Sequence, residues 1–432
     1  MSKKDPEAYI TLGSVCSKIG SGATPRGGKS VYIDEGISLI RSQNVINLYF
    51  SYDGLAHITD EAGQKLKGVT IEEDDVLLNI TGDSVARCCM VANDVLPARV
   101  NQHVCIIRPD KNILNPTYLM YYLNTSHIQQ YLLLLAMGKG ASRNAITKEM
   151  VEKFTIERVP IEQQNRIAEI LSQYDKAIAI NKKRIDILDN MAHEIYQEWF
   201  VRFRYPGHEK SDFKKSKIGK IPEQFEELKM EDIFDYYIGG GWGNEDQDKE
   251  FSQEAYVIRG ADFPSVAKGD VTSCPLRYHK VSNYEKRVLQ KNDIILEVSG
   301  GTAEQPVGRT ILVDDDILDR LDRRVICASF CKLVRLKDII NPYYFYYWMQ
   351  FLYDTRIIDR FQLQSTGIIN FKFEYFLRKG DVLMPPMELM QRFEDAVKPL
   401  HDEKHLLARK NDNLIKQRDM LIPRLMSGKL KV

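Results

Sequence analysis

The sequence lacks net charge, long apolar runs and a secretion signal. Its 432 residues contain 60 Lys and Arg against 60 Asp and Glu. This balance disfavours a protein that holds nucleic acid by bulk positive charge, although it permits local basic patches. No apolar run approaches the roughly 18 residues that a membrane span needs, and the N-terminal MSKKDPEAYI has no apolar signal core. We therefore expect a cytoplasmic protein.

Cysteine and histidine are sparse and form no framework. The seven cysteines are an odd number without disulfide spacing, which indicates reduced thiols in a cytosol. Cys88 and Cys89 are adjacent and cannot chelate a metal as a CxxC pair does. The eight histidines show no metal-binding spacing. We therefore expect no metal site.

Two Asn-Pro pairs resemble part of an amino-methyltransferase site but are incomplete. Asn115-Pro116 and Asn341-Pro342 lack the second proline of an Asn-Pro-Pro-Tyr motif, and no glycine fingerprint for S-adenosylmethionine precedes them. Asparagine is a good helix N-cap and proline a good first helical residue. The pairs are therefore predicted to start helices.

Two further stretches resemble catalytic motifs without completing them. The segment GGGWGN, residues 239–244, has no lysine in P-loop spacing, which leaves contact of its backbone amides with DNA phosphate as an open alternative. Asp293 and Glu297 lack the lysine of a nuclease motif, so Asp293 is predicted to lie in a turn before a strand. We expect no catalytic residue and no enzymatic activity.

What the sequence does have is a long helical segment at residues 160–200. It contains no glycine, and its only proline is at the start, where a missing N–H costs nothing. A second segment of the same character, Met387 to Leu421, supplies the partner that such an amphipathic helix needs. The apolar residues of the first helix follow a seven-residue repeat: Ile167, Leu171, Tyr174, Ile178, Ile185, Leu188, Ala192, Ile195 and Trp199.

The remainder of the chain forms two mixed α/β blocks. In the first, buried strands are predicted at residues 36–45, 74–80 and 104–108, followed by a helix after Asn115. The predicted domains are a first block at 1–159, a long helix at 160–201, an exposed linker at 202–221, a second block at 222–386, and a second long helix with a tail at 387–432.

The second half repeats the first. Ile40 and Ile258 stand 218 positions apart, as do Asp75 and Asp293, whereas Asn115 and Asn341 stand 226 apart. The change of offset predicts a net insertion near residues 312–324, and the later offset aligns Cys105 with Cys331 as core positions. The predicted fold class is α+β: a tandem duplication of a mixed α/β domain, each copy followed by a long helix, with the two helices packed as an antiparallel coiled coil.

The ordered segments of this duplication resemble the specificity (S) subunit of Type I restriction–modification systems. The similar segments are GSGATP ending at Pro25, GVTIEEDDVLLNITGD at 68–83, RVNQHVCIIRP at 99–109, VPIEQQNRIAEILSQYD at 159–175 and LIPRLMSGKL near the C-terminus. In the second half, GGGWGN and CASFCKLVR replace the expected loop and strand sequences, so the resemblance is looser there.

The resemblance implies a DNA-binding function without catalysis. Each block would be a target recognition domain for one half of a bipartite DNA sequence, and the helices would space the two domains. Two methyltransferase (M) subunits would dock on the helices, and restriction (R) subunits would join through the complex. S-adenosylmethionine and ATP would bind to these partners, and the chain itself would hold no cofactor.

Base recognition requires side chains with hydrogen-bonding groups, usually on loops. Lys29 and Lys139 suit phosphate better than a base. The predicted DNA-binding residues of the first block are Thr24, Arg26, Lys29, Arg41, Gln43, Asn44, Ser84, Arg87, Lys139, Ser142, Arg143 and Asn144; those of the second are Trp242, Asn244, Arg259, Asp262, Thr302, Gln305, Arg323, Arg324, Gln364, Ser365 and Thr366.

Two features of the first helix stay open. Asn181 interrupts the apolar stripe and would face Leu407 if the helices pair symmetrically, fixing their register at a cost in stability. Lys182, Lys183 and Arg184 form either a solvated face or a contact with an M subunit or DNA. The alternatives to an S subunit are a self-contained DNA methyltransferase or nuclease, and a helical scaffold without a DNA role.

Overall fold

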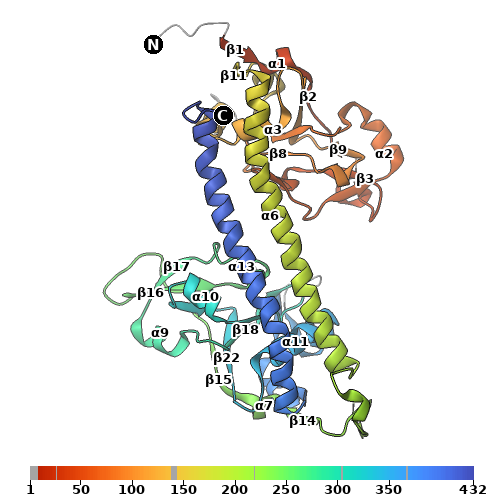
Figure 1. Cartoon of the computed structure of the whole chain (residues 1–432), viewed down its shortest axis with the longest axis vertical. Coiled ribbons are helices and arrows are strands. Elements are labelled where there is room, and N and C mark those ends of the chain that lie inside the picture. Colours follow the sequence, from red (N-terminus) through yellow and green to blue (C-terminus); the bar gives the residue numbers. More distant parts are fainter. Residues whose placement is uncertain (1–7, 26, 138–143, 218, 303–304, 366–367) are drawn as a thin grey trace. The chain divides into compact units, whose positions relative to one another are not determined.

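The computed structural model describes residues 8–25, 27–137, 144–217, 219–302, 305–365 and 368–432 (Figure 1). The chain divides into two compact units: Met1–Ile178 with Leu414–Val432, and Ala179–Asn413. The helices α6 (Ile161–Tyr196) and α13 (Met387–Met426) each contribute one end to each unit. Among the described helices, none is long and apolar enough to cross a membrane.

The first unit contains a four-stranded and a three-stranded sheet. The larger sheet has the order β2-β10-β7-β8 with antiparallel neighbours, and the smaller has the order β6-β3-β9 with β3 and β9 parallel. The strands are β2 (Cys16–Ser21), β10 (Val104–Pro109), β7 (Val76–Asn79), β8 (Cys88–Met90), β6 (Ala56–Ile58), β3 (Ile37–Ile40) and β9 (Ala98–Val100).

The second unit has the same two sheet orders. Its larger sheet is β15-β22-β18-β20, and its smaller sheet is β17-β16-β21 with β16 and β21 parallel. Both sheets of this unit therefore match those of the first unit strand by strand. The strands are β15 (Phe234–Gly239), β22 (Cys331–Leu336), β18 (Ile294–Glu297), β20 (Thr310–Leu312), β17 (Leu276–His279), β16 (Gln253–Ile258) and β21 (Val325–Cys327).

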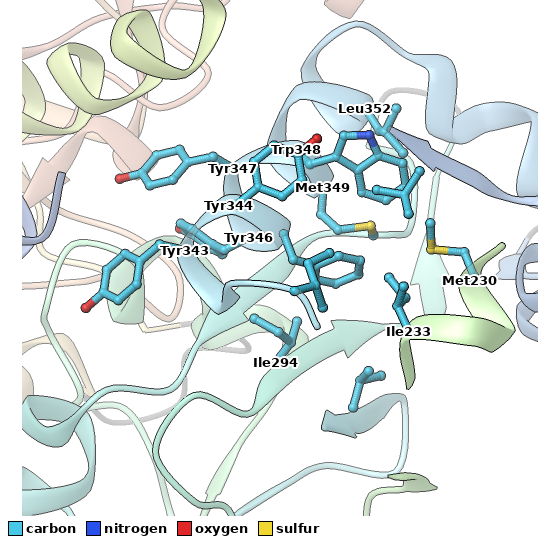
Figure 2. Close-up of a cluster of buried hydrophobic side chains, with 14 of the residues drawn as sticks. Met230, Ile233, Ile294, Tyr343, Tyr344, Tyr346, Tyr347, Trp348, Met349 and Leu352 are labelled. Carbon is cyan, nitrogen blue, oxygen red and sulfur yellow. The ribbon is translucent and has the colours of Figure 1, made fainter. Parts of the chain in front are cut away.

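The central strands β7 and β18 are buried along their whole length and mostly apolar because both of their faces are covered. On β7, Val76 and Leu78 pack into one hydrophobic cluster and Leu77 into another. On β18, Ile294 packs against the aromatic residues of α11 (Pro342–Asp354), while Ile295 faces a separate cluster (Figure 2). The predicted strands at 36–45, 74–80 and 104–108 are thus present, with the bounds of β3, β7 and β10.

The Asn-Pro pairs begin helices, as predicted. Asn115 Oδ1 accepts a hydrogen bond from the N–H of Tyr118 at 2.9 Å, where α3 (Pro116–Leu123) starts. Asn341 Oδ1 accepts from the N–H groups of Tyr343 at 2.9 Å and Tyr344 at 3.2 Å at the start of α11. These capping bonds account for both asparagines without a methyltransferase site.

Asp293 lies immediately before β18, as predicted, and has a counterpart in the first unit. It accepts hydrogen bonds from Arg335 at 2.7 and 2.8 Å, as Asp75 does from Arg108. Because Arg108 and Arg335 are 227 positions apart, the alignment of Cys105 with Cys331 is wrong by one residue. In the strand register, Cys105 lies opposite Leu78 and Cys331 lies opposite Glu297. The two buried thiols therefore lie on non-equivalent faces of their respective sheets.

The ends of α6 and α13 pack together within each unit. In the second unit, Ile185 packs against Leu407 and Ala408. Asn181 therefore does not face Leu407, as symmetric pairing of the helices would require: its Nδ2 donates to Asn411 Oδ1 at 2.9 Å. The side chain of Asn411 can satisfy this amide group, which Leu407 cannot. Arg184 pairs with Glu403 at 3.0 Å.

In the first unit, the same two helices meet through apolar and charged contacts. Ile167 and Leu171 of α6 share a cluster with Ile422 and Leu425 of α13, and Arg418 forms an ion pair with Asp175. In both units, higher residue numbers on α6 face lower ones on α13, so the helices run in opposite directions.

The described residues of the segment 202–221 are mostly exposed, as its polar composition predicts, but the segment also has regular structure and a buried anchor. It contains β12 (Phe213–Ser216), which pairs with β13 (Gly219–Pro222). Tyr205 is buried and stacks on Phe225 at a ring-centroid distance of 5.8 Å. A few aromatic anchors therefore fix a segment whose average composition is hydrophilic.

Candidate nucleic-acid interface

The first unit carries a cavity of about 540 Å³ at the loops that leave its central strands. The loop after β3, the β7–β8 turn and the β9–β10 loop all contribute to its wall. It brings together four predicted DNA-binding residues from distant parts of the sequence. The lining residues are Ser42, Gln43, Thr81, Gly82, Asp83, Ser84, Arg87, His103, Asn144 and Ala145.

Arg87 is the exposed cation of this first cavity. It belongs to the short turn between β7 and β8, where its backbone N–H donates to Ser84 O at 3.2 Å. Among the described residues, none forms an ion pair with Arg87, so its guanidinium keeps its donors available. Gln43 and Asn144 are also exposed, which gives the cavity two amide groups of the kind that bind adenine.

A chain of polar contacts leads from the predicted residue Thr24 to His103 and Thr81, which line the cavity. Thr24 donates to Gln102 Oε1, the amide of Gln102 contacts His103 Nε2 at 3.1 Å, and His103 Nδ1 contacts the hydroxyl of Thr81. Asn101, by contrast, is buried and accepts the N–H of His103 at 3.0 Å. The segment 101–103 thus both shapes the loop and contributes His103 to the cavity.

Asn44 is not available to DNA, contrary to the prediction. Its side chain is fully buried, and its Oδ1 accepts the N–H of Arg41 at 3.0 Å. Its Nδ2 donates to Ser51 O at 3.0 Å and Asp53 O at 3.2 Å. An asparagine side chain can stabilise a loop as well as recognise a base. Here both the oxygen and the nitrogen of the Asn44 amide are hydrogen-bonded to the backbone of the loop.

Arg41 and Gln43 also support this loop, but less completely. Arg41 donates to Gly54 O and stacks over Tyr32 at 5.3 Å. Gln43 Nε2 donates to Asp53 O at 3.0 Å, and the residue also lines the cavity. Gln43 therefore remains a candidate contact, and Arg41 is mainly a positioning residue.

The second unit has a cavity of about 600 Å³ at the corresponding loops. The loop after β16, the β18–β20 connection and the β21–β22 loop form it, together with Trp242 from the segment after β15. Of the predicted residues, it brings together Trp242, Arg259 and Gln305. The lining residues are Trp242, Arg259, Gly260, Ala261, Glu297, Ser299, Gly300, Gln305, Arg309, Ala328, Ser329 and Phe330.

Exposed aromatic rings distinguish this second cavity. The side chain of Phe330 is 64% exposed and that of Trp242 39% exposed. The guanidinium of Arg277 stacks on Trp242 at 4.6 Å and holds the indole in place. Phe330 was not predicted from the sequence, although it occupies the loop position that His103 holds in the first unit.

Two ion pairs make the second cavity rigid. Arg309 donates to Glu297 Oε2 at 2.8 Å and to Gly260 O at 2.9 Å. Arg259 donates to Asp262 at 2.8 and 2.7 Å, and Ser273 adds a hydroxyl donor to the same carboxylate. Burial alone would raise the pKa of Asp262, but these donors outweigh it and lower the pKa below 3.8.

Asp262 is therefore a structural group instead of the predicted DNA contact. Its side chain is 2% exposed, and both of its oxygens are occupied. Arg259 is bound on one edge by this carboxylate and by Ser273 O, and lines the cavity with the remainder of its side chain. Asp262 was predicted to contact DNA from its residue type alone. Residue type does not distinguish a carboxylate that accepts a hydrogen bond from cytosine from one that pairs with an arginine of the same chain.

Of the remaining predicted residues, those whose side chains the structure describes do not line either cavity. Arg323 pairs with Asp319 at 2.6 Å and Arg324 with Glu254 and Asp322, so nearby carboxylates compensate both charges. Thr302 caps a turn through Gln305 N, and Asn244 bridges Tyr278 through its backbone. Arg26, Lys139, Ser142, Arg143 and Thr366 lie outside the described residues, as do the side chains of Lys29, Gln364 and Ser365.

Comparison with protein families gives a match over residues 7–190. The matching family is described as the Type I restriction modification DNA specificity domain. This stretch includes the first cavity and nearly all of α6. It ends before the second cavity, where the sequence resemblance is also looser.

Similar proteins cover more of the chain. The putative type I restriction enzyme MjaX specificity subunit of Methanocaldococcus jannaschii is 23% identical over 337 residues, or 76% of this chain and 72% of that protein. The MjaIX specificity subunit of the same organism is 23% identical over 423 residues, or 96% of this chain and 91% of that protein.

A solved structure shares the fold. The Type-I restriction-modification system S subunit from M. genitalium superposes with a TM-score of 0.53 at 12% sequence identity, covering 98% of this chain and 97% of that one. The likeness supports the mixed helix and sheet architecture described above.

Proposed function

Because this chain carries a Type I restriction modification DNA specificity domain in residues 7–190, we propose that it is the DNA-binding specificity subunit of a Type I restriction–modification complex. Each unit would recognise one half of a bipartite target through its cavity. Partner subunits would then methylate or cleave the DNA. The comparisons support the family resemblance that the sequence predicted and give no support to a self-contained methyltransferase or nuclease.

The observation that carries this proposal is the pair of corresponding cavities. Both are formed by the loops after equivalent strands, β3 and β16, β7 and β18, β9 and β21. Their linings differ: the first combines Arg87 with amides and His103, and the second combines aromatic rings with arginines. A common scaffold with different linings is what two independent sequence recognition sites require.

We further propose that the chain arose by tandem duplication and that α6 and α13 form an antiparallel coiled coil. The matching strand orders and the Asp75–Arg108 and Asp293–Arg335 pairs support the duplication. The helix segment α10 (Asp315–Arg320), between β20 and β21, occupies the predicted insertion. The Ile185–Leu407 packing and the Asn181–Asn411 bond support the coiled coil.

The proposed partners follow from this role. Double-stranded DNA would bind at the two cavities, and two M subunits would dock on the paired helices, with R subunits joining the complex. S-adenosylmethionine and ATP would bind to those partners, the chain would act without catalysis of its own, and the assembly would work in the cytoplasm. Because the chain has no net charge, the partners would supply much of the attraction to phosphate.

A methyl-transfer assay tests the proposal. The purified chain, its cognate M subunit and the two together are incubated with genomic DNA and radiolabelled S-adenosylmethionine. We expect transfer to DNA only when both proteins are present. Methyl transfer by the chain alone would contradict the proposal. So would methyl transfer by the M subunit alone, if the methylated DNA sites stay the same when this chain is added.

A further inference from the structure

Two histidines and a carboxylate converge in the second unit, away from the cavity. His401 and His405 lie one turn apart on α13, and Asp314 lies at the start of α10. One potential ligand atom from each of the three side chains lies within 4.8 Å of the others. Both histidines are 5% exposed or less, so the group is shielded from solvent.

His401 has no hydrogen-bond partner in the described part of the chain. Both of its ring nitrogens are buried, and neither finds a donor or an acceptor there. Its ring lies among Tyr343, Tyr346 and Tyr347, at centroid distances of 5.5, 5.9 and 5.9 Å. A buried imidazole without a partner is costly, so it needs an explanation.

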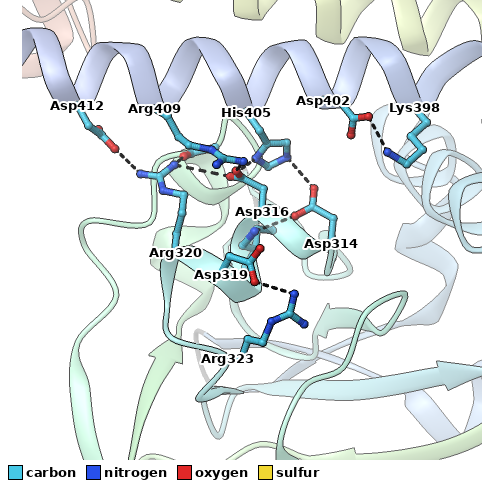
Figure 3. Close-up of polar contacts among 12 residues, drawn as sticks. Asp314, Asp316, Asp319, Arg320, Arg323, Lys398, Asp402, His405, Arg409 and Asp412 are labelled. Atoms are coloured by element: carbon cyan, nitrogen blue, oxygen red, sulfur yellow. Dashed lines mark hydrogen bonds and ion pairs between the residues drawn. The ribbon is translucent and has the colours of Figure 1, made fainter.

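His405 and Asp314 are held in place by other bonds. His405 Nδ1 contacts Asp316 Oδ2 at 3.0 Å, while its Nε2 faces Asp314 Oδ2 at 2.9 Å (Figure 3). Asp314 Oδ1 accepts the N–H of Ile317 at 2.9 Å as the N-cap of α10. One atom of each side chain is therefore used for orientation, and the second atoms, His405 Nε2 and Asp314 Oδ2, contact each other.

We propose that Asp314, His401 and His405 bind a divalent transition-metal ion, with Zn²⁺ the best match to two imidazoles and one carboxylate. Histidines four apart on a helix present both rings on one face, a spacing found in zinc sites. The contact of His405 with Asp316 is the carboxylate–histidine arrangement that orients metal-bound imidazoles. The ring of His401, whose nitrogens have no hydrogen-bond partner among the described residues, would then serve as a metal ligand. The three ligands leave one coordination position for water.

The geometry requires only a small adjustment. Donor atoms around tetrahedral Zn²⁺ lie roughly 3.3 Å apart, given metal–ligand distances of about 2.0–2.2 Å. His405 Nε2 and Asp314 Oδ2 are already 2.9 Å apart, so it is the donor of His401, within 4.8 Å of the others, that needs to move inward. Side-chain rotation of His401, whose nitrogens have no bond to break within the described residues, provides most of this movement.

The surrounding charges are compatible with a cation. Lys404, which is 1% exposed, directs its Nζ to Asp189 of α6 at 3.0 Å, and Arg409 pairs with Asp316. Asp314 pairs only with His405 among the described cations. The ion would take the place of a proton on His405 Nε2, so the site gains one positive charge beside Asp314.

Metal binding would fasten the inserted helix α10 to α13. The two elements already meet through Asp316 with Arg409 and through Arg320 with Asp412. The bonds between the metal ion and its ligands would depend less on salt concentration than these ion pairs do. The second recognition unit would therefore be held more firmly to its long helix.

The test uses the full-length chain without an affinity tag. After chelator treatment and dialysis, Zn²⁺ is added, and bound metal is measured by mass spectrometry and titration calorimetry. We expect a single Zn²⁺ per chain and an increase in melting temperature. Co²⁺ should give the visible absorption of a tetrahedral site with nitrogen ligands. No saturable binding of either ion to the wild-type chain would overturn the proposal.

Variants then locate the ion. His401→Phe keeps a buried ring of similar size and should abolish the Co²⁺ spectrum. Asp316→Asn alters the contact that orients His405, together with the pairing of Asp316 to Arg409, and should weaken binding about 10- to 100-fold. His208→Ala, in a different segment of the same unit, is the matched control and should bind as the wild type does. Unaltered binding in a folded His401→Phe chain, verified by circular dichroism, would overturn the assignment.

Discussion

The Nδ2 of Asn181 on α6 donates a 2.9 Å hydrogen bond to Oδ1 of Asn411 on α13. The pair lies beside the apolar Ile185–Leu407 contact, and Asn411 is only 6% exposed. One amide finds its partner at one helix register and loses it at the others. The pair therefore specifies register at a cost in stability.

Replacing one or both of these asparagines separates the two effects. Asn181→Leu should lower the free energy of unfolding by about 1–3 kcal/mol because Asn411 is left unpaired. The double variant Asn181→Leu with Asn411→Leu should recover this loss. Urea denaturation measures both, with exposed Asn413→Leu on α13 as the control. A double variant less stable than the single one would contradict the account.

The Arg259–Asp262 pair predicts a pH-dependent stability. Arg259→Met should destabilise the chain at neutral pH by about 1–3 kcal/mol, since a buried carboxylate loses its partner. The pKa of Asp262 is below 3.8 in the folded chain, so the stabilisation is present above about pH 4 and disappears as pH falls through the folded pKa.

Denaturation at neutral and acidic pH tests this pair. The difference between wild type and Arg259→Met should shrink as the carboxyl becomes protonated. Lys111→Met is the control, because the Lys111–Asp74 pair is exposed and should contribute less than about 1 kcal/mol. A stability difference that does not depend on pH would show that Asp262 is not the partner that matters.

Arg87 and Arg323 make a matched pair of exposed arginines with different surroundings. Arg87 lines the first cavity, whereas Arg323 is paired with Asp315 and Asp319. Arg87→Ala should weaken binding of the assembled complex to its target about 10- to 100-fold, the effect of about 1–3 kcal/mol for a base contact. Arg323→Ala should leave binding unchanged. Fluorescence anisotropy with labelled duplex measures both, and equal losses would be evidence against the cavity as the binding site.

Phe330 should affect binding without affecting stability. Its ring is 64% exposed at the second cavity, so Phe330→Ala should change the free energy of unfolding by less than about 0.5 kcal/mol. Affinity for the target should fall about fivefold or more, the effect of roughly 1 kcal/mol. Phe213→Ala, at a 48% exposed phenylalanine in β12, is the control. Equal affinity of the Phe330 variant and wild type would exclude a contact at this ring.

The elements of the fold were predictable where local chemistry determines them. The runs at β7 and β10 are apolar because clusters cover both faces, and Asn115 and Asn341 cap helices by the same rule that predicts them. The alignment of Cys105 with Cys331 failed because the offset between the two blocks differs before, within and after β22, and strand pairing alone reveals the register within it.

The site was only partly predictable because one residue type serves several purposes. Gln43 and Arg87 line a cavity, whereas Asn44 and Asp262, chosen by the same criterion, hold loops together. Phe330 carries no hydrogen-bonding signal and was missed. The histidines were expected to show no metal-binding spacing, although His401 and His405 are four residues apart, and Asp314 joins them only through the packing of α10 on α13.

The central claim is that the two blocks recognise separate halves of one DNA target. Exchanging residues 1–159 for the corresponding block of a relative, in cells that contain the M subunit, tests it directly. Sequencing of methylated adenines should then show one half of the target changed and the other half, with the spacing between them, unchanged. A change in both halves, or in neither, would contradict the account.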